Sequence, residues 1–419
     1  MHRIWVAVIF VLLSAEYCFG VKPVLGVKVG VGYDLLSQEY FLDSAIAEGP
    51  DSLLTRWTLR TTYLDDIKAR IDFNVTHPDR RSYSFRSTYE QARELIRVRL
   101  NGDWRPTVGP IALEWRGQTD WRVRYRDTSK PGDTYFSGSG SIRARYPFSS
   151  QLSTFVQAQG NIVSFEYPAQ YVYDYYRVGG KVGMELISAT GLAGVSAFLL
   201  QRQVPDSQNL DYDNAGLDAS WLSSYGWGDL DLFARFDHKN YNQPGDQDDY
   251  RRLELTARSR QGLGQRYFLR QEVEAAQYFY NDEDLLNASF LELAGVVQMG
   301  YQSGGLMVGA GPEGKILREE DKNGTTGEDY TEGGLQLDLD YLGSSLFGSL
   351  EWSTGYRTLA LESEGQTDFF YQRLNILFDW TLQERWTFSL FGAAEWEWHS
   401  PSSDDSRLYL LSTALSYSF

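Results

Sequence analysis

The stretch WTFSLFGAAEWEW, residues 386–398, decides the fold class. Its even-numbered positions, 386 to 398, hold only Trp, Phe, Leu, Gly and Ala, whereas Thr387, Ser389, Glu395 and Glu397 fall at odd positions. Because side chains two residues apart share one face of a β-strand, the pattern predicts a strand with one apolar face and one largely polar face. At about 3.3 Å per residue such a strand spans about 40 Å, enough to cross a bilayer at a tilt.

The same alternation recurs at Ile67–Val75, Trp121–Tyr125 and Leu335–Tyr341, and continues to the last residue. No long helical periodicity follows the first twenty residues. We therefore predict an all-β chain that forms a closed antiparallel transmembrane β-barrel of about 20–22 strands, with an even number expected. Residues 82–100 contain neither Gly nor Pro, so they form either one long strand or two strands joined around residues 90–94.

Short turns and longer polar loops are expected to alternate, because the two ends of such a barrel differ. The sequence predicts short turns at residues 117–120, 225–228, 343–345 and 383–385. It predicts long loops at residues 203–211, 239–249, 315–329, 360–367 and 399–405, and a long early connection at residues 34–52 that could fold inward.

The first twenty residues have the organisation of a secretory signal peptide. Arg3 precedes an apolar run of only ten residues, Ile4–Leu13, which is short for a membrane-spanning helix of about 20 residues. We predict a signal peptide at residues 1–20 and a barrel at residues 21–419. Cys18 is the only cysteine, so the mature chain is expected to have no disulfide, Cys-based metal site or catalytic thiol.

The last strand places Tyr409, Leu411, Thr413, Leu415, Tyr417 and Phe419 on one face. This ending resembles the C-terminal signal of bacterial outer-membrane β-barrel proteins, among them the porins. The resemblance implies a location in the bacterial cell outer membrane, contact with its lipid and lipopolysaccharide, and recognition of Tyr417 and Phe419 by the outer-membrane assembly machinery. A secreted soluble sandwich or propeller would also alternate, but no internal repeat supports a propeller.

Charge is distributed unevenly along the chain. The net charge of −17 argues against nucleic acid as a partner. Residues 53–146 contain 18 Lys and Arg against 11 Asp and Glu, whereas residues 147–419 contain 18 against 39. We expect a basic wall at Arg97, Arg99, Arg116, Arg122, Arg124, Arg126, Arg143 and Arg145, opposite an acidic wall at Glu272, Glu274, Glu292, Asp338, Asp340, Glu351 and Glu395.

Two functions are compatible with such walls. The first is a porin-like passive channel for small solutes, in which the transverse field sets the preference. The alternative is a non-conducting structural, assembly or partner-binding barrel, in which opposite charges pair and fill the interior. Neither His238 nor His399 has a nucleophile motif or a metal-spaced partner, so we expect no enzyme, no catalytic residue, no metal and no cofactor; the sequence does not indicate the oligomeric state.

Overall fold

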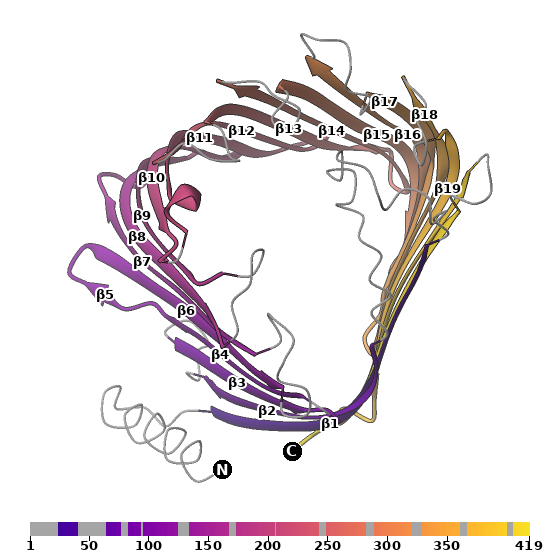
Figure 1. Cartoon of the computed structure of the whole chain (residues 1–419), viewed down its shortest axis with the longest axis horizontal. Coiled ribbons are helices and arrows are strands. Elements are labelled where there is room, and N and C mark those ends of the chain that lie inside the picture. Colours follow the sequence, from indigo (N-terminus) through magenta and orange to yellow (C-terminus); the bar gives the residue numbers. More distant parts are fainter. Residues whose placement is uncertain are drawn as a thin grey trace.

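A ring of antiparallel strands forms the described part of the chain (Figure 1). The computed structural model describes residues 24–40, 64–76, 83–93, 95–124, 134–166, 173–205, 207–242, 249–281, 289–320, 329–360, 367–399 and 405–419. Among these residues, no helix is long and apolar enough to cross a membrane. The predicted signal peptide lies outside the described residues, as does Arg126.

The elements follow one another in chain order. They are β1 (Val24–Tyr40), β2 (Leu64–Thr76), β3 (Tyr83–Gln91), β4 (Leu95–Trp104), β5 (Thr107–Val108), β6 (Ile111–Arg124), β7 (Tyr135–Pro147), β8 (Leu152–Phe165), β9 (Tyr175–Ile187), β10 (Gly191–Gln203), the 3₁₀ turn η3 (Gln208–Leu210), β11 (Tyr212–Tyr225), β12 (Gly228–Tyr241), β13 (Tyr250–Leu263), β14 (Tyr267–Tyr280), β15 (Ser289–Ser303), β16 (Leu306–Glu320), β17 (Tyr330–Leu342), β18 (Leu346–Leu359), β19 (Phe369–Leu382), β20 (Trp386–His399) and β21 (Ser406–Ser418).

The barrel closes because β1 pairs with β2 on one side and with β21 on the other. Both β4 and β5 pair with β6, and the break between them falls at Arg105 and Pro106. Proline has no backbone N–H to donate to the ladder, which accounts for the break. Counting β4 and β5 as one interrupted strand gives a 20-strand barrel, within the predicted range of 20–22.

The connections differ between the two ends of the barrel. Those at residues 226–227, 264–266, 304–305, 343–345 and 383–385 are short and lie at the end where β1 begins and β21 stops. The predicted turns at 225–228, 343–345 and 383–385 are thus confirmed. Short turns face the periplasm in outer-membrane barrels, so the other end, which carries the longer connections, is the outer mouth.

Two expectations about local structure are settled by the strand bounds. Residues 82–100 contain two strands, β3 and β4, joined by a tight turn in which the Ala92 N–H donates to the Leu95 carbonyl at 2.9 Å. The predicted turn at 117–120 is wrong, because it lies within β6, where Gly117 pairs with Gly102 of β4 and Gly140 of β7. The Trp115 ring fills the space beside Gly117, so that glycine marks close packing and no turn.

Several predicted loops are shorter than expected. β1 extends to Tyr40, so the first part of the predicted connection at 34–52 is strand. β16 extends to Glu320 and β12 to Tyr241, so the loops predicted from residues 315 and 239 begin later. The loop at 203–211 is confirmed and contains η3. The ends of these strands extend past the apolar outer surface and are rich in polar residues. Their composition therefore resembles that of loops.

The outer face of the barrel is apolar and is not covered by other described parts of the chain. Val156 is 62% exposed, Leu199 60% and Met299 63%, each on a strand whose neighbouring positions face the interior. Large apolar side chains at this exposure are unfavourable in water over so wide a surface. The face therefore suits acyl chains, as the alternating pattern predicts.

Inward aromatic rings lie over glycines on the neighbouring strand. Four such pairs are directly opposite in register: Phe155 and Gly183, Phe198 and Gly216, Phe268 and Gly300, Tyr371 and Gly355. A Cβ on each of these glycines would lie 2.1 to 2.7 Å from an atom of the aromatic side chain. The missing side chain thus makes room for the ring, a form of aromatic rescue that holds the curved wall together.

Candidate functional site: the inner wall of the barrel

Most charged side chains of the strands lie on the concave inner face. They alternate along each strand with the exposed apolar residues, as with Glu272 and Glu274 on either side of Val273. Some of them reach across intervening strands: Arg143 of β7 contacts Glu185 of β9, and Arg270 of β14 contacts Asp338 of β17 at 3.1 Å. Such contacts form where side chains converge, which occurs on the inside of a curved sheet.

The predicted basic residues occupy this face, but most have carboxylate partners. Arg97 Nε donates to Asp120 at 2.8 Å, and Arg99 donates to Glu90 at 3.1 Å. Arg116 pairs with Glu114 at 2.7 Å, and both Arg143 and Arg145 pair with Glu185. Arg124 faces the same way as Leu95, its register partner on β4.

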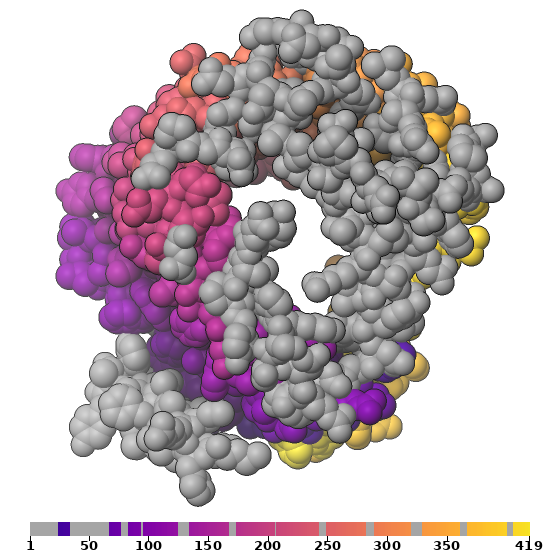
Figure 2. All heavy atoms as spheres, viewed as in Figure 1, coloured from indigo at the N-terminus to yellow at the C-terminus, as the bar shows by residue number. Residues whose placement is uncertain are grey.

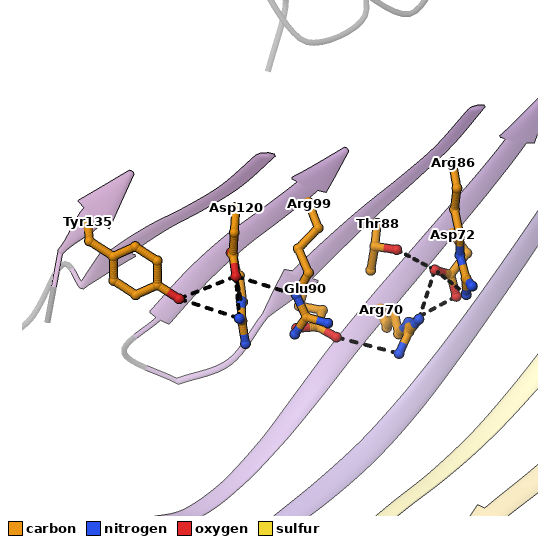
Figure 3. Close-up of polar contacts among 9 residues, drawn as sticks. Arg70, Asp72, Arg86, Thr88, Glu90, Arg99, Asp120 and Tyr135 are labelled. Atoms are coloured by element: carbon orange, nitrogen blue, oxygen red, sulfur yellow. Dashed lines mark hydrogen bonds and ion pairs between the residues drawn. The ribbon is translucent and has the colours of Figure 1, made fainter. Parts of the chain in front are cut away.

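A continuous row of polar contacts crosses β7, β6, β4, β3 and β2 (Figure 3). Glu90 lies between Arg99, at 3.1 Å, and Arg70, at 3.6 Å. Asp72 is 4% exposed and accepts hydrogen bonds from Arg70 at 2.9 Å and from Thr88 at 2.6 Å. Opposite charges therefore alternate along this wall. The basic residues of β2–β7, which we call the basic sector, are partly neutralised by acidic residues of the same strands.

Arg122 differs from its neighbours. It lies directly opposite Arg97 in register, and its buried Nε has no hydrogen-bond partner among the described residues. No carboxylate of the described chain forms an ion pair with Arg122, whereas Arg97 is held by Asp120. Like charges directly opposite each other destabilise a sheet, so an uncompensated guanidinium here is a candidate for contact with solutes.

The predicted acidic residues also face inward, and five of the seven contact a basic or amide group. Arg258 contacts Glu272 at 2.6 Å and Glu274 at 3.0 Å, and Lys315 contacts Glu292 at 2.7 Å. Arg270 and Gln298 both reach Asp338, and Arg373 reaches Glu395 at 2.6 Å.

Asp340 and Glu351 are the exceptions in the acidic sector. Asp340 accepts a hydrogen bond only from the Ser349 hydroxyl, at 2.6 Å, and Glu351 has no hydrogen bond or ion pair within the described chain. Glu332 of β17, which the sequence did not single out, is 7% exposed and binds Arg357 at 2.6 Å and Arg373 at 3.0 Å. Glu332 thus holds two arginines of the acidic sector, although the sequence prediction of the acidic wall did not include it.

The imbalance between sectors persists in the described structure, although both sectors are mixed. The inward positions of β2–β7 carry ten basic residues (Lys68, Arg70, Arg86, Arg97, Arg99, Arg116, Arg122, Arg124, Arg143, Arg145) and five acidic ones (Asp72, Glu90, Asp103, Glu114, Asp120). Those of β12–β20 carry nine basic residues (Arg235, Lys239, Arg252, Arg258, Arg260, Arg270, Lys315, Arg357, Arg373) and sixteen acidic ones (Asp229, Asp231, Asp237, Glu254, Glu272, Glu274, Glu292, Glu313, Glu319, Glu332, Asp338, Asp340, Glu351, Asp379, Glu395, Glu397).

Tyrosines line the inside of the outer mouth. Lys239 Nζ lies 4.2 Å from the centre of the Tyr212 ring, 5.0 Å from that of Tyr241 and 5.2 Å from that of Tyr250. Arg202 lies 4.5 Å from the Tyr212 ring. Attraction between cations and aromatic faces stabilises this arrangement. The parity of these tyrosines, which match the charged positions of their strands, could have revealed it.

The carboxyl-terminal residues close the barrel at the short-turn end. Tyr417 pairs with Val29 of β1 and with Trp386 of β20, whose ring centre is 5.0 Å from its own. The Phe419 N–H donates to the Val27 carbonyl at 3.0 Å, while the Phe419 side chain is 78% exposed. The terminal ring is therefore available to another molecule.

Comparison with solved structures supports the fold. The chain is similar to the siderophore receptor PirA of Pseudomonas aeruginosa, with 12% identity, a TM-score of 0.53, and coverage of 95% of this chain and 81% of that one. PirA of Acinetobacter baumannii gives 9% identity, a TM-score of 0.51, and coverage of 95% and 81%. OccAB3 of Acinetobacter baumannii gives 10% identity, a TM-score of 0.50, and coverage of 94% and 99%. No protein-family model and no curated protein sequence matches the chain.

These similarities concern the fold, since the identities are low. Together with the closed 20-strand ring and the apolar outer face, they establish the chain as a bacterial outer-membrane β-barrel, as its final strand implied.

Proposed function

We propose that this barrel is a porin-like passive channel for small solutes, with a preference set by its unevenly charged inner wall. The observation that carries the proposal is that the charge network follows the wall. Among the described residues, each ion pair lies within one strand or joins strands no more than three positions apart around the barrel, as Arg270 and Asp338 do. Charges arranged in this way support the wall without bridging the lumen.

Barrel width supports the same proposal. Side chains alone fill a barrel of about eight strands, and this one has 20. Viewed down the barrel, the space-filling surface leaves an opening within the ring (Figure 2). The excess of basic residues on β2–β7 and of acidic residues on β12–β20 would produce a transverse field, which orients dipolar solutes during passage. Neither a catalytic group nor a cofactor is needed for this function.

The experiment is single-channel recording of the refolded full chain in planar lipid bilayers. A passive channel gives ohmic current steps and a reversal potential in a salt gradient that shifts when inner-wall charges are removed. Arg122→Gln is the informative variant because its guanidinium has no carboxylate partner in the described chain. A membrane that stays silent with correctly folded protein would favour the alternative, a non-conducting structural or partner-binding barrel.

A further inference from the structure

An unbroken row of inward polar residues runs across the wall from β3 to β9. In register, Arg86 pairs with Asn101, Asn101 with Gln118, Gln118 with Ser139, Ser139 with Asn161, and Asn161 with Arg177. We refer to these six residues as the polar track. Five steps between strands, at about 4.8 Å each, give the track a length of about 24 Å.

The track runs obliquely from one end of the barrel to the other. Arg86 lies near the start of β3, at the short-turn end, and Arg177 lies near the start of β9, at the outer mouth. All six residues line one groove of about 800 Å³. The groove is therefore continuous along the direction in which a solute would travel.

The middle of the track offers unused hydrogen-bonding groups. The side chains of Asn101, Gln118 and Ser139 form no hydrogen bond with any described residue, and none carries a charge. Amides and hydroxyls both donate and accept, which suits solutes rich in hydroxyl groups. Many charged side chains of the inner wall, in contrast, are engaged in ion pairs such as that of Arg97 with Asp120.

The outer end of the track carries uncompensated positive charge. Arg177 lies directly opposite Arg202 of β10, and neither forms an ion pair with a carboxylate of the described chain. Arg177 Nε donates to Asn161 at 3.2 Å, and Arg202 donates to the Leu210 carbonyl at 2.6 Å. Both guanidinium groups lie at the outer mouth without a carboxylate partner in the described chain, so they attract an oxyanion that reaches this end of the track.

We infer that the polar track binds hydroxylated organic anions, with the carboxylate or phosphate of a sugar acid or sugar phosphate at Arg177 and Arg202 and its hydroxyls on Gln118 and Ser139. This inference rests on the proposed channel function and names the substrate class of the same lumen. Guanidinium groups recognise carboxylate and phosphate through paired N–H donors, and the amides add selection for hydroxyls.

The test measures how strongly glucuronate, glucose 6-phosphate, glucose and cyclohexanecarboxylate block potassium chloride current through the full chain in bilayers. Parallel calorimetric titration in detergent detects binding without conduction. We expect glucuronate or glucose 6-phosphate to block at lower concentration than either glucose or cyclohexanecarboxylate. The comparison of the first two probes distinguishes a carboxylate from a phosphate preference.

Variants separate the two parts of the track. The double variant Arg177→Gln with Arg202→Gln should raise the half-blocking concentration of the sugar anion at least tenfold. Arg258→Gln removes the same type of charge from the acidic sector and should change it less than twofold. Gln118→Leu should reduce the preference for glucuronate over cyclohexanecarboxylate by at least fivefold, a change that simple charge attraction would not produce.

Failure of the track and failure of the channel give different results. Current with no sugar-anion binding, or an equal response in the double variant and in Arg258→Gln, would overturn the track and leave the channel intact. Binding that depends on Arg177 and Arg202 in a protein that passes no current would support the track and overturn the channel.

Discussion

Replacing Gly300 with alanine tests the packing that stiffens the barrel wall. A Cβ at this position would lie 2.1 Å from Phe268 Cζ and 2.5 Å from its Cε1. Carbon atoms in contact prefer about 3.5 Å, so the ring would have to retreat by about 1.4 Å. It has little space to do so, because Phe268 is 4% exposed and the Arg260 guanidinium lies 4.6 Å from its ring centre.

Overpacking of this kind destabilises a protein by about 1–3 kcal/mol. We therefore expect Gly300→Ala to lower the free energy of unfolding by about that amount, measured by urea titration of the protein folded into phospholipid vesicles with tryptophan fluorescence as the signal. The matched control is Gly333→Ala on β17, where an added Cβ would meet nothing within 4 Å. The control should change stability by less than about 0.5 kcal/mol.

A second variant keeps this prediction falsifiable if Gly300→Ala fails to fold. Gly300→Ala combined with Phe268→Leu removes the colliding ring and should regain part of the lost stability. If Gly300→Ala and Gly333→Ala unfolded at the same urea concentration, the ring would not be held by its glycine, and the role assigned to these pairs would be wrong.

Three further predictions concern charge and closure. Glu332→Gln leaves Arg357 and Arg373 without their shared carboxylate and should cost about 2–3 kcal/mol in the same unfolding assay, less than a fully buried pair because both arginines are partly exposed. Arg122→Gln should shift the reversal potential toward lower anion selectivity while changing stability by less than about 0.5 kcal/mol, since it breaks no ion pair; an unchanged potential would remove Arg122 from the conduction path. Deleting Phe419, whose ring is exposed, should slow membrane assembly more than it destabilises the folded barrel, as measured by the heat-modifiable fraction on gels over time; assembly at the normal rate would contradict the role given to the last residue.

The fold could be predicted because each strand of a transmembrane barrel alternates apolar residues that face lipid with polar residues that face the interior. The apolar positions of residues 386–398 and the polar ones between them lie outside and inside as their alternation predicts. The role of one glycine was predicted wrongly. Gly117 suggested a turn, but it lies in β6 beside the Trp115 ring. Sequence alone cannot distinguish a glycine that bends the chain from one that admits a neighbouring ring, because the position of the ring depends on the side-chain conformation and on the packing of adjacent strands.

The sequence predicted which charged residues face the interior, but it did not predict their ion-pair partners. Alternation placed Arg97 and Arg143 on the inner face, but it could not show that Asp120 and Glu185 would meet them there. Pair contacts depend on register, and register depends on which strands are neighbours and how they are staggered. The same limit concealed the polar track, whose six residues come from six separate strands.

The most direct test of the account is thiol accessibility at two adjacent positions of β8. Val156 is 62% exposed on the outer face, and Gln157 follows it on the inner face. Cys18 is the only native cysteine, so single cysteines at 156 and 157 can be introduced without other thiols in a chain that lacks it. In a membrane, a water-soluble maleimide should modify Gln157→Cys rapidly and Val156→Cys hardly at all. Equal modification of both would mean that the apolar face meets water, which would contradict the barrel's place in the bilayer.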